Sequence, residues 1–108
     1  MQIDWNPVIH ILDELSDGTH SFLELSYMVS HYEREAFTDS LLFLAERDLI
    51  ELLAGRGPFE PIPKDEWPRR LRDAFGSDVA DPVVLVGTSI DLSERGEQVL
   101  HLFGIGHP

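Results

Sequence analysis

The amino-acid sequence predicts a single α+β domain. The chain has 108 residues, 43% of them hydrophobic, which suits one globular core and leaves too few residues for a second. Apolar residues recur at helical spacing in three consecutive segments before residue 48. Short apolar runs bounded by Gly and Pro follow in the second half, as is typical of strands.

The first predicted helix begins at Asn6-Pro7. Asn is a favourable N-cap, and Pro suits the first helical position because its missing N–H would have no helical acceptor there. The helix ends at Asp17-Gly18, since Gly readily adopts a left-handed conformation. Its apolar side chains share one face: Val8, Ile11, Leu12 and Leu15.

Two capping-box patterns predict where the next two helices begin. Ser21 is followed three residues later by Glu24, and Ser30 by Glu33. The second of these helices closes at Arg47-Asp48. Apolar residues supply the core sides of the two helices: Phe22, Leu25, Met28 and Val29, then Phe37, Leu41, Leu42, Phe43 and Leu44.

Strands and a last helix are predicted further along. Residues 49–53 form an apolar run that ends at a Gly- and Pro-rich turn. Residues 83–86 are β-branched or apolar, and residues 89–92 alternate polar with apolar, so both are predicted as strands. Ser93 then caps a last helix that closes before Gly104.

An insertion at about residues 56–87 separates the first strand from the later ones. A helix is predicted over residues 65–76, because Trp67, Leu71 and Phe75 are spaced by fours. Pro68 falls in the first turn of this helix, where Pro is tolerated.

Two stretches resemble MarR-like bacterial regulators, which are winged-helix proteins. Residues 41–52, Leu-Leu-Phe-Leu-Ala-Glu-Arg-Asp-Leu-Ile-Glu-Leu, are similar to the segment in which the third helix of that family leads into the wing. Residues 90–100 are similar to the family's Leu-Thr-Glu-x-Gly stretch, which closes the wing. The resemblance implies one winged-helix domain over residues 1–108, with three N-terminal helices, a small antiparallel wing sheet with a helical insertion, and a short C-terminal helix.

The resemblance also carries functional expectations. In DNA-binding members the third helix enters the major groove. Members commonly form dimers through terminal helices, so Trp5 and residues 99–103 could form the seam of a homodimer. Asp48 stands where the family usually has Gly, and Asp tolerates the left-handed conformation better than most residues. The insertion is not covered by the resemblance.

The net charge argues against nucleic acid as the partner. Twenty Asp and Glu against eight Lys and Arg give a net charge of −12 at pH 7. Nucleic-acid binders depend on Lys and Arg to neutralise phosphates, whereas an acidic surface favours basic proteins. We therefore expect a protein-interaction module with a basic protein partner. An immunity protein or antitoxin that neutralises a basic toxin fits this description.

Carboxylates near the end of the first helix and the start of the third are the expected interface. The expected partner-binding residues are Asp13, Glu14, Asp17, Glu33, Glu35 and Asp39. Charge reversal on the third helix should weaken partner binding if this expectation is correct.

The alternative is a small dimeric transcriptional regulator that binds DNA through its few cations. These are Arg34, Arg56, Lys64, Arg69, Arg70 and Arg72. The competing interpretation of the basic cluster is that the apolar side of its helix faces the core while the cations pair with neighbouring acids. Those acids are Asp65, Glu66 and Asp73.

No motif in the chain indicates catalysis, a metal or a cofactor. There is no cysteine, no P-loop and no Gly-x-Ser-x-Gly elbow. The five histidines form neither a His-x-His nor a His-x-x-x-His pattern, and a metal site needs three or four converging ligands. We expect neither an enzyme nor a metal-binding protein.

Targeting signals are also missing from the sequence. The first residues lack a basic segment followed by an apolar run, and no stretch is apolar for long enough to span a membrane. We expect a cytoplasmic protein without a membrane partner.

Overall fold

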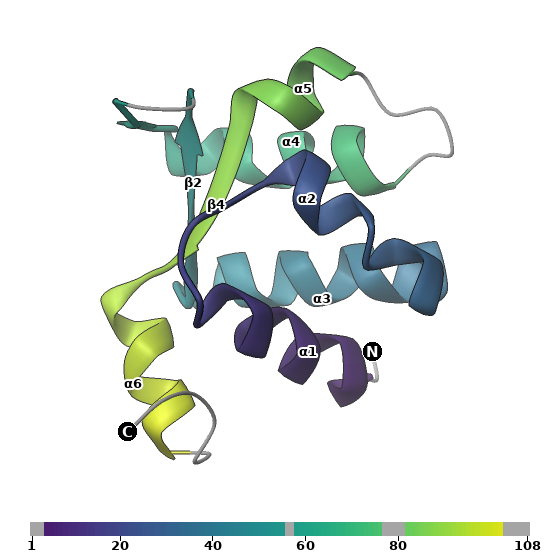
Figure 1. Ribbon diagram of the computed structural model, residues 1–108, viewed down its shortest axis with the longest axis vertical. Coiled ribbons are helices and arrows are strands. Elements are labelled where there is room, and N and C mark those ends of the chain that lie inside the picture. Colours follow the sequence, from purple (N-terminus) through teal and green to yellow (C-terminus); the bar gives the residue numbers. More distant parts are fainter. Residues whose placement is uncertain (1–3, 56–57, 77–81, 103–108) are drawn as a thin grey trace.

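The structure is a computed structural model that describes residues 4–55, 58–76 and 82–102. Helices alternate with the strands of one small antiparallel sheet, so the protein is α+β (Figure 1). The elements in chain order are α1 (Trp5–Leu15), β1 (His20–Ser21), α2 (Phe22–Ser26), the 3-10 helix η1 (Val29–His31), α3 (Arg34–Glu46), β2 (Ile50–Ala54), β3 (Glu60–Pro61), the 3-10 helix η2 (Lys64–Glu66), α4 (Trp67–Phe75), α5 (Pro82–Gly87), β4 (Thr88–Leu92) and α6 (Glu94–Leu102).

The sheet has the strand order β1-β4-β2-β3. Its longest pairing joins β2 to β4, from Ile50 opposite Leu92 to Ala54 opposite Thr88. Side chains alternate between the two faces of a strand. Ile50 and its neighbours on one face are therefore buried in the core, while Glu51 and Asp91 lie on the other face and are half-buried.

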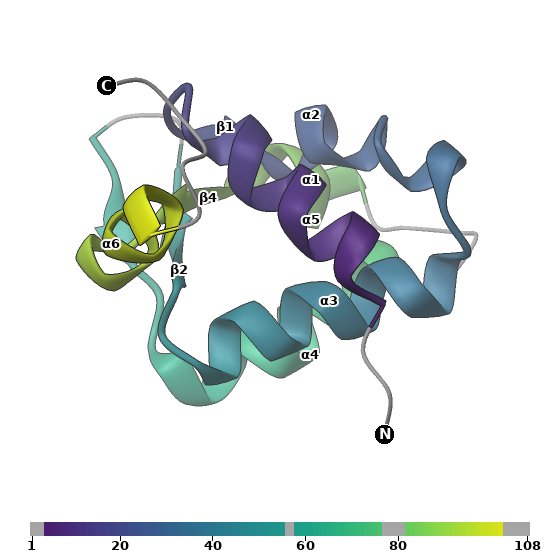
Figure 2. The same ribbon diagram turned by 90° about the horizontal axis from the view of Figure 1, so that it is seen from below.

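The helices α1, α2 and α3 lie on one side of β2 and β4 (Figure 1). Helix α6 follows β4 and contacts α1. Helix α4 lies alongside α3, which is clearest from below (Figure 2). None of the helices in the described ranges is long and apolar enough to cross a bilayer.

The inserted helix α4 completes the core. Phe75 is fully buried, and its ring lies 5.1 Å from that of Phe22 and 5.7 Å from that of Phe37. Leu71 is also fully buried, and Trp67 is half-buried. The expectation that this side of the insertion helix faces the core is confirmed for Leu71 and Phe75 and holds in part for Trp67.

The turn from α3 into β2 has the conformation expected from the sequence. Asp48 has a φ of 61°, in the left-handed region. The carbonyl of Asp48 accepts a hydrogen bond from the Ser93 hydroxyl, and Ser93 Oγ accepts one at 3.0 Å from the Gly96 N–H. A Cβ at Gly96 would come within 2.0 Å of the Leu49 carbonyl oxygen, so only Gly fits here. The start of α6 is thereby fixed against the start of β2.

The prediction of a strand over residues 83–86 is wrong. These residues belong to α5, which packs against α2 and α4. The strand β4 begins only at Thr88 and already has β1 on one edge and β2 on the other, so this sheet offers no further edge beside it. Short apolar runs do not distinguish strand from helix, and β-propensity is easily overridden by packing.

Two predicted helix starts are also wrong. Helix α1 begins at Trp5, two residues earlier than predicted, because Asp4 rather than Asn6 is the N-cap and its Oδ1 accepts a hydrogen bond from the Asn6 N–H at 3.1 Å. Ser30 does not begin α3 but lies in η1, where its hydroxyl donates to the Tyr27 carbonyl at 3.2 Å. Of the two predicted capping boxes, only the one that begins at Ser21 forms.

Candidate functional site

Two carboxylates face each other across the outer face of the sheet. Glu51 on β2 is directly opposite Asp91 on β4, and both are half-buried. Loss of solvent on burial, and then the negative charge of Asp91, raise the pKa of Glu51 above its usual 4.5. Like charges directly opposite on neighbouring strands destabilise a sheet. This arrangement favours a cation, or the cationic side chain of a partner, between the two carboxylates.

The turn after α1 leads into the strand that borders this pair, although α1 itself lies on the inner side of the sheet (Figure 1). The strand β1 pairs with β4, and extending its register by one residue puts Thr19 opposite Asp91. The turn that contains Asp17 immediately precedes that position, and Asp13 and Asp17 are exposed. We define the acidic region by five residues: Asp13, Glu14, Asp17, Glu51 and Asp91.

Basic residues are scarce on the elements that form the acidic region. The first 33 residues contain six Asp and Glu and no Lys or Arg. Among the described residues from 82 onward, Arg95 is the one Lys or Arg. The described residues of these two segments therefore offer few cations to Asp13, Glu14 and Asp91.

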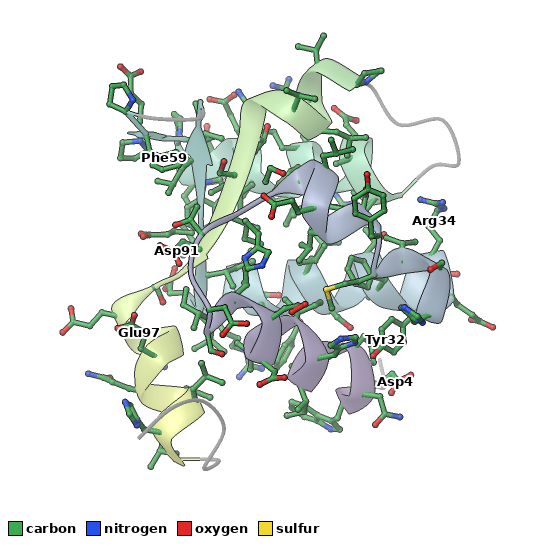
Figure 3. All side chains as sticks on the ribbon, in the orientation of Figure 1. Asp4, Tyr32, Arg34, Phe59, Asp91 and Glu97 are labelled. Atoms are coloured by element: carbon green, nitrogen blue, oxygen red, sulfur yellow. The ribbon has the colours of Figure 1, made fainter. Side chains whose placement is uncertain are left out.

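The predicted interface residues of α3 lie elsewhere. Glu33 is the residue before α3, and Glu35 and Asp39 lie in the first half of that helix. The end of α1 lies far from the start of α3 in both views (Figures 1 and 2). Asp91 is on the opposite side of the domain from Arg34 and Tyr32 (Figure 3). The six predicted residues thus form two groups rather than one patch.

Most cations of the insertion are held by neighbouring acids. Lys64 pairs with Asp48, while Arg69 and Arg70 lie 3.5 and 3.6 Å from a single carboxylate oxygen of Glu66. The competing interpretation of the basic cluster is therefore confirmed for Glu66. No ion pair in the described part of the chain involves Asp65 or Asp73.

The remaining predicted DNA-binding residues differ in their surroundings. Arg34 donates a hydrogen bond from Nη1 to the Phe75 carbonyl at 3.3 Å, which ties the start of α3 to the end of α4. Arg72 is exposed. Arg56 lies outside the described residues.

The outward side of α3 carries carboxylates rather than cations. Glu35, Asp39, Leu42 and Glu46 are spaced by four, three and four residues, so they share one stripe of the helix. A helix that reads the major groove is positioned by donors to phosphate oxygens. This stripe offers none, because Glu35, Asp39 and Glu46 only accept hydrogen bonds when ionised.

A groove of about 410 Å³ lies between α3 and α4. Its apolar lining comes from both helices: Leu42, Ala45, Trp67 and Pro68. Three charged residues complete the lining: Glu46, Lys64 and Arg72. The Trp67 indole N–H donates to the Ile62 carbonyl at 2.8 Å, so the apolar part of its ring is what the groove presents.

The residues expected to form a dimer seam do not lie together. Trp5 is 56% exposed, and its ring meets that of Phe43 edge-on at 5.6 Å. Leu102 is 85% exposed but belongs to α6, beyond the other end of α1 (Figure 2). Phe103 lies outside the described residues.

The histidines do not form a metal site in the described part of the chain. No group of three or more described His, Asp or Glu residues converges in a way that could hold a metal ion. His10 Nδ1 lies 2.6 Å from the Tyr32 hydroxyl, a hydrogen bond that ties α1 to the segment before α3.

The sequence did contain a signal for the pair that was missed. Residues 50–52 are Ile-Glu-Leu and residues 90–92 are Ile-Asp-Leu, both predicted as strands. Antiparallel pairing in register of two such apolar–acid–apolar triplets puts the acids opposite each other on the outer face. What the sequence could not supply was that these two strands are neighbours.

Comparison with known proteins gives no relative. No family model matches the chain, and no curated protein or solved structure is significantly similar to it.

Proposed function

We propose that this chain is a winged-helix domain that binds a basic protein partner through its acidic region. The winged-helix assignment is supported by the order of α1, β1, α2, α3, β2 and β4, with β4 between β1 and β2. It is also supported by the left-handed Asp48 and by Gly96, which stand where the resemblance implies a special backbone position.

The observation that carries the proposal is the opposed pair of Glu51 and Asp91. Each carboxylate would be more stable without the other, and half-burial adds to the cost of ionising Glu51. A Lys or Arg side chain placed between them would remove this repulsion and lower the pKa of Glu51. Partner binding would therefore convert an unfavourable contact of the free protein into a favourable one.

The class of partner follows from the same charges. A protein whose basic surface binds nucleic acid has the spaced Lys and Arg side chains that suit the carboxylates of the acidic region. An immunity protein or antitoxin acts by covering such a surface. Glu33, Glu35 and Asp39 lie outside the proposed site, because they are on the other side of the domain.

The test compares two isosteric variants in an affinity-capture experiment from a lysate of the organism that encodes the protein. One carries Glu51→Gln with Asp91→Asn, and the other carries Glu35→Gln with Asp39→Asn, so both lose two negative charges. We expect wild type and the α3 variant to retain the same basic protein, and the sheet variant to retain at least tenfold less of it. Equal retention by both variants would refute the proposed site.

DNA binding remains the alternative, and one observation favours it. The predicted DNA-binding cations that fall within the described residues all lie on α3, η2 or α4. Anisotropy of a labelled random-sequence duplex, titrated with the protein from low to physiological salt, decides between the two functions. Binding that weakens steeply with salt would support the regulator, and no binding at low salt would exclude it.

A further inference from the structure

Most cations of this chain lie on two neighbouring helices, α3 and α4, and on the segments next to them. Six of its eight Lys and Arg residues lie on α3, directly after it, or on η2 and α4. They are Arg34, Arg47, Lys64, Arg69, Arg70 and Arg72. Two copies of a protein with a net charge of −12 repel each other wherever carboxylate meets carboxylate. Within the described surface, the side formed by α3 and α4 is where two copies can best bring unlike charges together.

The groove on this side has opposite charges on its two rims. Glu46 lies on the α3 rim and Arg72 on the α4 rim, with Leu42 and Trp67 in the apolar lining between them. Glu46 and Arg72 are both exposed, and no ion pair in the described ranges involves either of them. Lys64, in contrast, is already paired with Asp48.

The two helices run antiparallel. Arg34 at the start of α3 bonds to Phe75 at the end of α4, whereas Glu46 at the end of α3 shares the groove with Trp67 at the start of α4. A twofold axis that runs along the groove, parallel to both helices, lays α3 of one copy on α4 of the other. Glu46 of each copy then meets Arg72 of the other, as the self-complementary contact of a twofold dimer requires.

We propose that the groove between α3 and α4 is the interface of a twofold homodimer. The apolar lining supplies surface to bury, and the two Glu46–Arg72 contacts set the register. The dimer covers Leu42 and Glu46 of the outward stripe of α3, and the groove includes neither Glu51 nor Asp91. This inference does not depend on the proposed partner, because neither Glu51 nor Asp91 lines the groove.

The test measures mass by sedimentation equilibrium over a range of concentrations at physiological salt, where long-range repulsion is screened. We expect wild type to pass from 12.3 kDa to twice that mass as its concentration rises. The Arg72→Glu and Glu46→Arg variants should each remain at 12.3 kDa. Each substitution places two side chains of the same charge opposite each other at both of the contacts between residues 46 and 72. An equimolar mixture of the two variants should regain the dimer mass. In the mixed dimer, each contact between positions 46 and 72 again joins a Glu of one copy to an Arg of the other.

Matched controls lie on α6, away from the groove. Arg95→Glu and Glu97→Arg make the same charge changes at exposed positions and should dimerise like wild type. Circular dichroism melting checks that all variants are folded. The proposal is overturned if wild type stays at 12.3 kDa at every concentration, which would leave the groove for another partner. It is equally overturned if the two groove variants dimerise like wild type, or if their mixture does not associate.

Discussion

Glu51 and Asp91 show how a single pair of residues can oppose the stability of the fold that contains it. Their strands pair over five residues, and the apolar neighbours of the pair are buried in the core. The carboxylates are therefore held opposite each other by packing on the other face of the sheet. Residues kept in an unfavourable environment by the surrounding structure are candidates for function.

Neutralising Glu51 should stabilise the protein. The raised pKa means that the folded state binds this proton more tightly than the unfolded state does. The contribution of Glu51 to stability is therefore fully present below the unfolded pKa of about 4.5 and is lost as the pH rises through the higher folded pKa. We expect Glu51→Gln to raise the free energy of unfolding at neutral pH by about 0.5–1 kcal/mol.

The measurement is urea unfolding at neutral pH and again at about pH 4, where the difference between variant and wild type should shrink. Glu97→Gln, an exposed acid on α6, is the control and should change stability by less than about 0.5 kcal/mol. A Glu51→Gln variant that is less stable than wild type at neutral pH would mean that Glu51 makes a favourable contact instead.

Gly96 is required for the close approach of α6 to β2. We expect Gly96→Ala to destabilise the protein by about 2–3 kcal/mol, because its Cβ would overlap the Leu49 carbonyl oxygen, which is backbone and cannot rotate away. Gly87→Ala is the matched control, since a Cβ there meets nothing within 4 Å. Thermal unfolding of both variants checks the prediction, which fails if the two variants have the same Tm.

At the scale of helices and strands, the elements with a signal in the local sequence were predicted. The elements that depend on tertiary contacts were missed. The helical spacing of apolar residues identified α1, α3 and α4, and Ser93 identified the start of α6. α5 was missed because its β-branched residues are typical of strands, while its actual contacts are with α2 and α4. Those contacts depend on tertiary packing, which local propensity does not contain.

The two capping-box patterns give a direct comparison at this scale. Ser21→Ala should cost about 1 kcal/mol, because the Ser21 hydroxyl accepts the Glu24 N–H at 3.1 Å and Glu24 bonds back to the Ser21 N–H. Ser30→Ala should cost less than about 0.5 kcal/mol, since Ser30 caps no helix.

Urea unfolding of both variants measures the difference. The Ser21 backbone N–H, which Ser21→Ala keeps, and then the Ser21 hydroxyl, which it removes, lower the pKa of Glu24. The contribution of the hydroxyl is present above about 4.5 and is lost as the pH falls through the folded pKa, so the difference in unfolding free energy between the two variants should narrow in acid. Equal losses at Ser21 and Ser30 would contradict the assigned start of α3.

For the whole molecule, the insertion is part of the core rather than an appendage. Phe75 fills the space between Phe22 and Phe37, so Phe75→Ala should cost about 3–5 kcal/mol. Arg69→Ala, at an exposed position on the same helix, should cost less than about 0.5 kcal/mol. Chemical unfolding of the two variants tests this, and a small loss at Phe75 would show that α4 is dispensable to the fold.

The distribution of charge over the whole molecule could be predicted only in part. The net charge and the cation-free first 33 residues are plain in the sequence. The separation of Asp13 from Glu35 by the fold, and the meeting of Glu51 with Asp91, depend on how α1, α3 and the strands are arranged. Composition therefore leads only to the proposal of a basic partner, whereas the position of a proposed site on the surface requires the structure.

Calorimetric titration of the purified basic partner tests the central claim most directly. It is titrated into wild type, the Glu51→Gln and Asp91→Asn double variant, and the Glu35→Gln and Asp39→Asn double variant, at low and at physiological salt. We predict affinity at least about tenfold weaker for the sheet variant, equivalent to about 1.4 kcal/mol, and within about twofold of wild type for the α3 variant. Equal affinity for all three proteins, or a loss confined to the α3 variant, would contradict a partner site at Glu51 and Asp91.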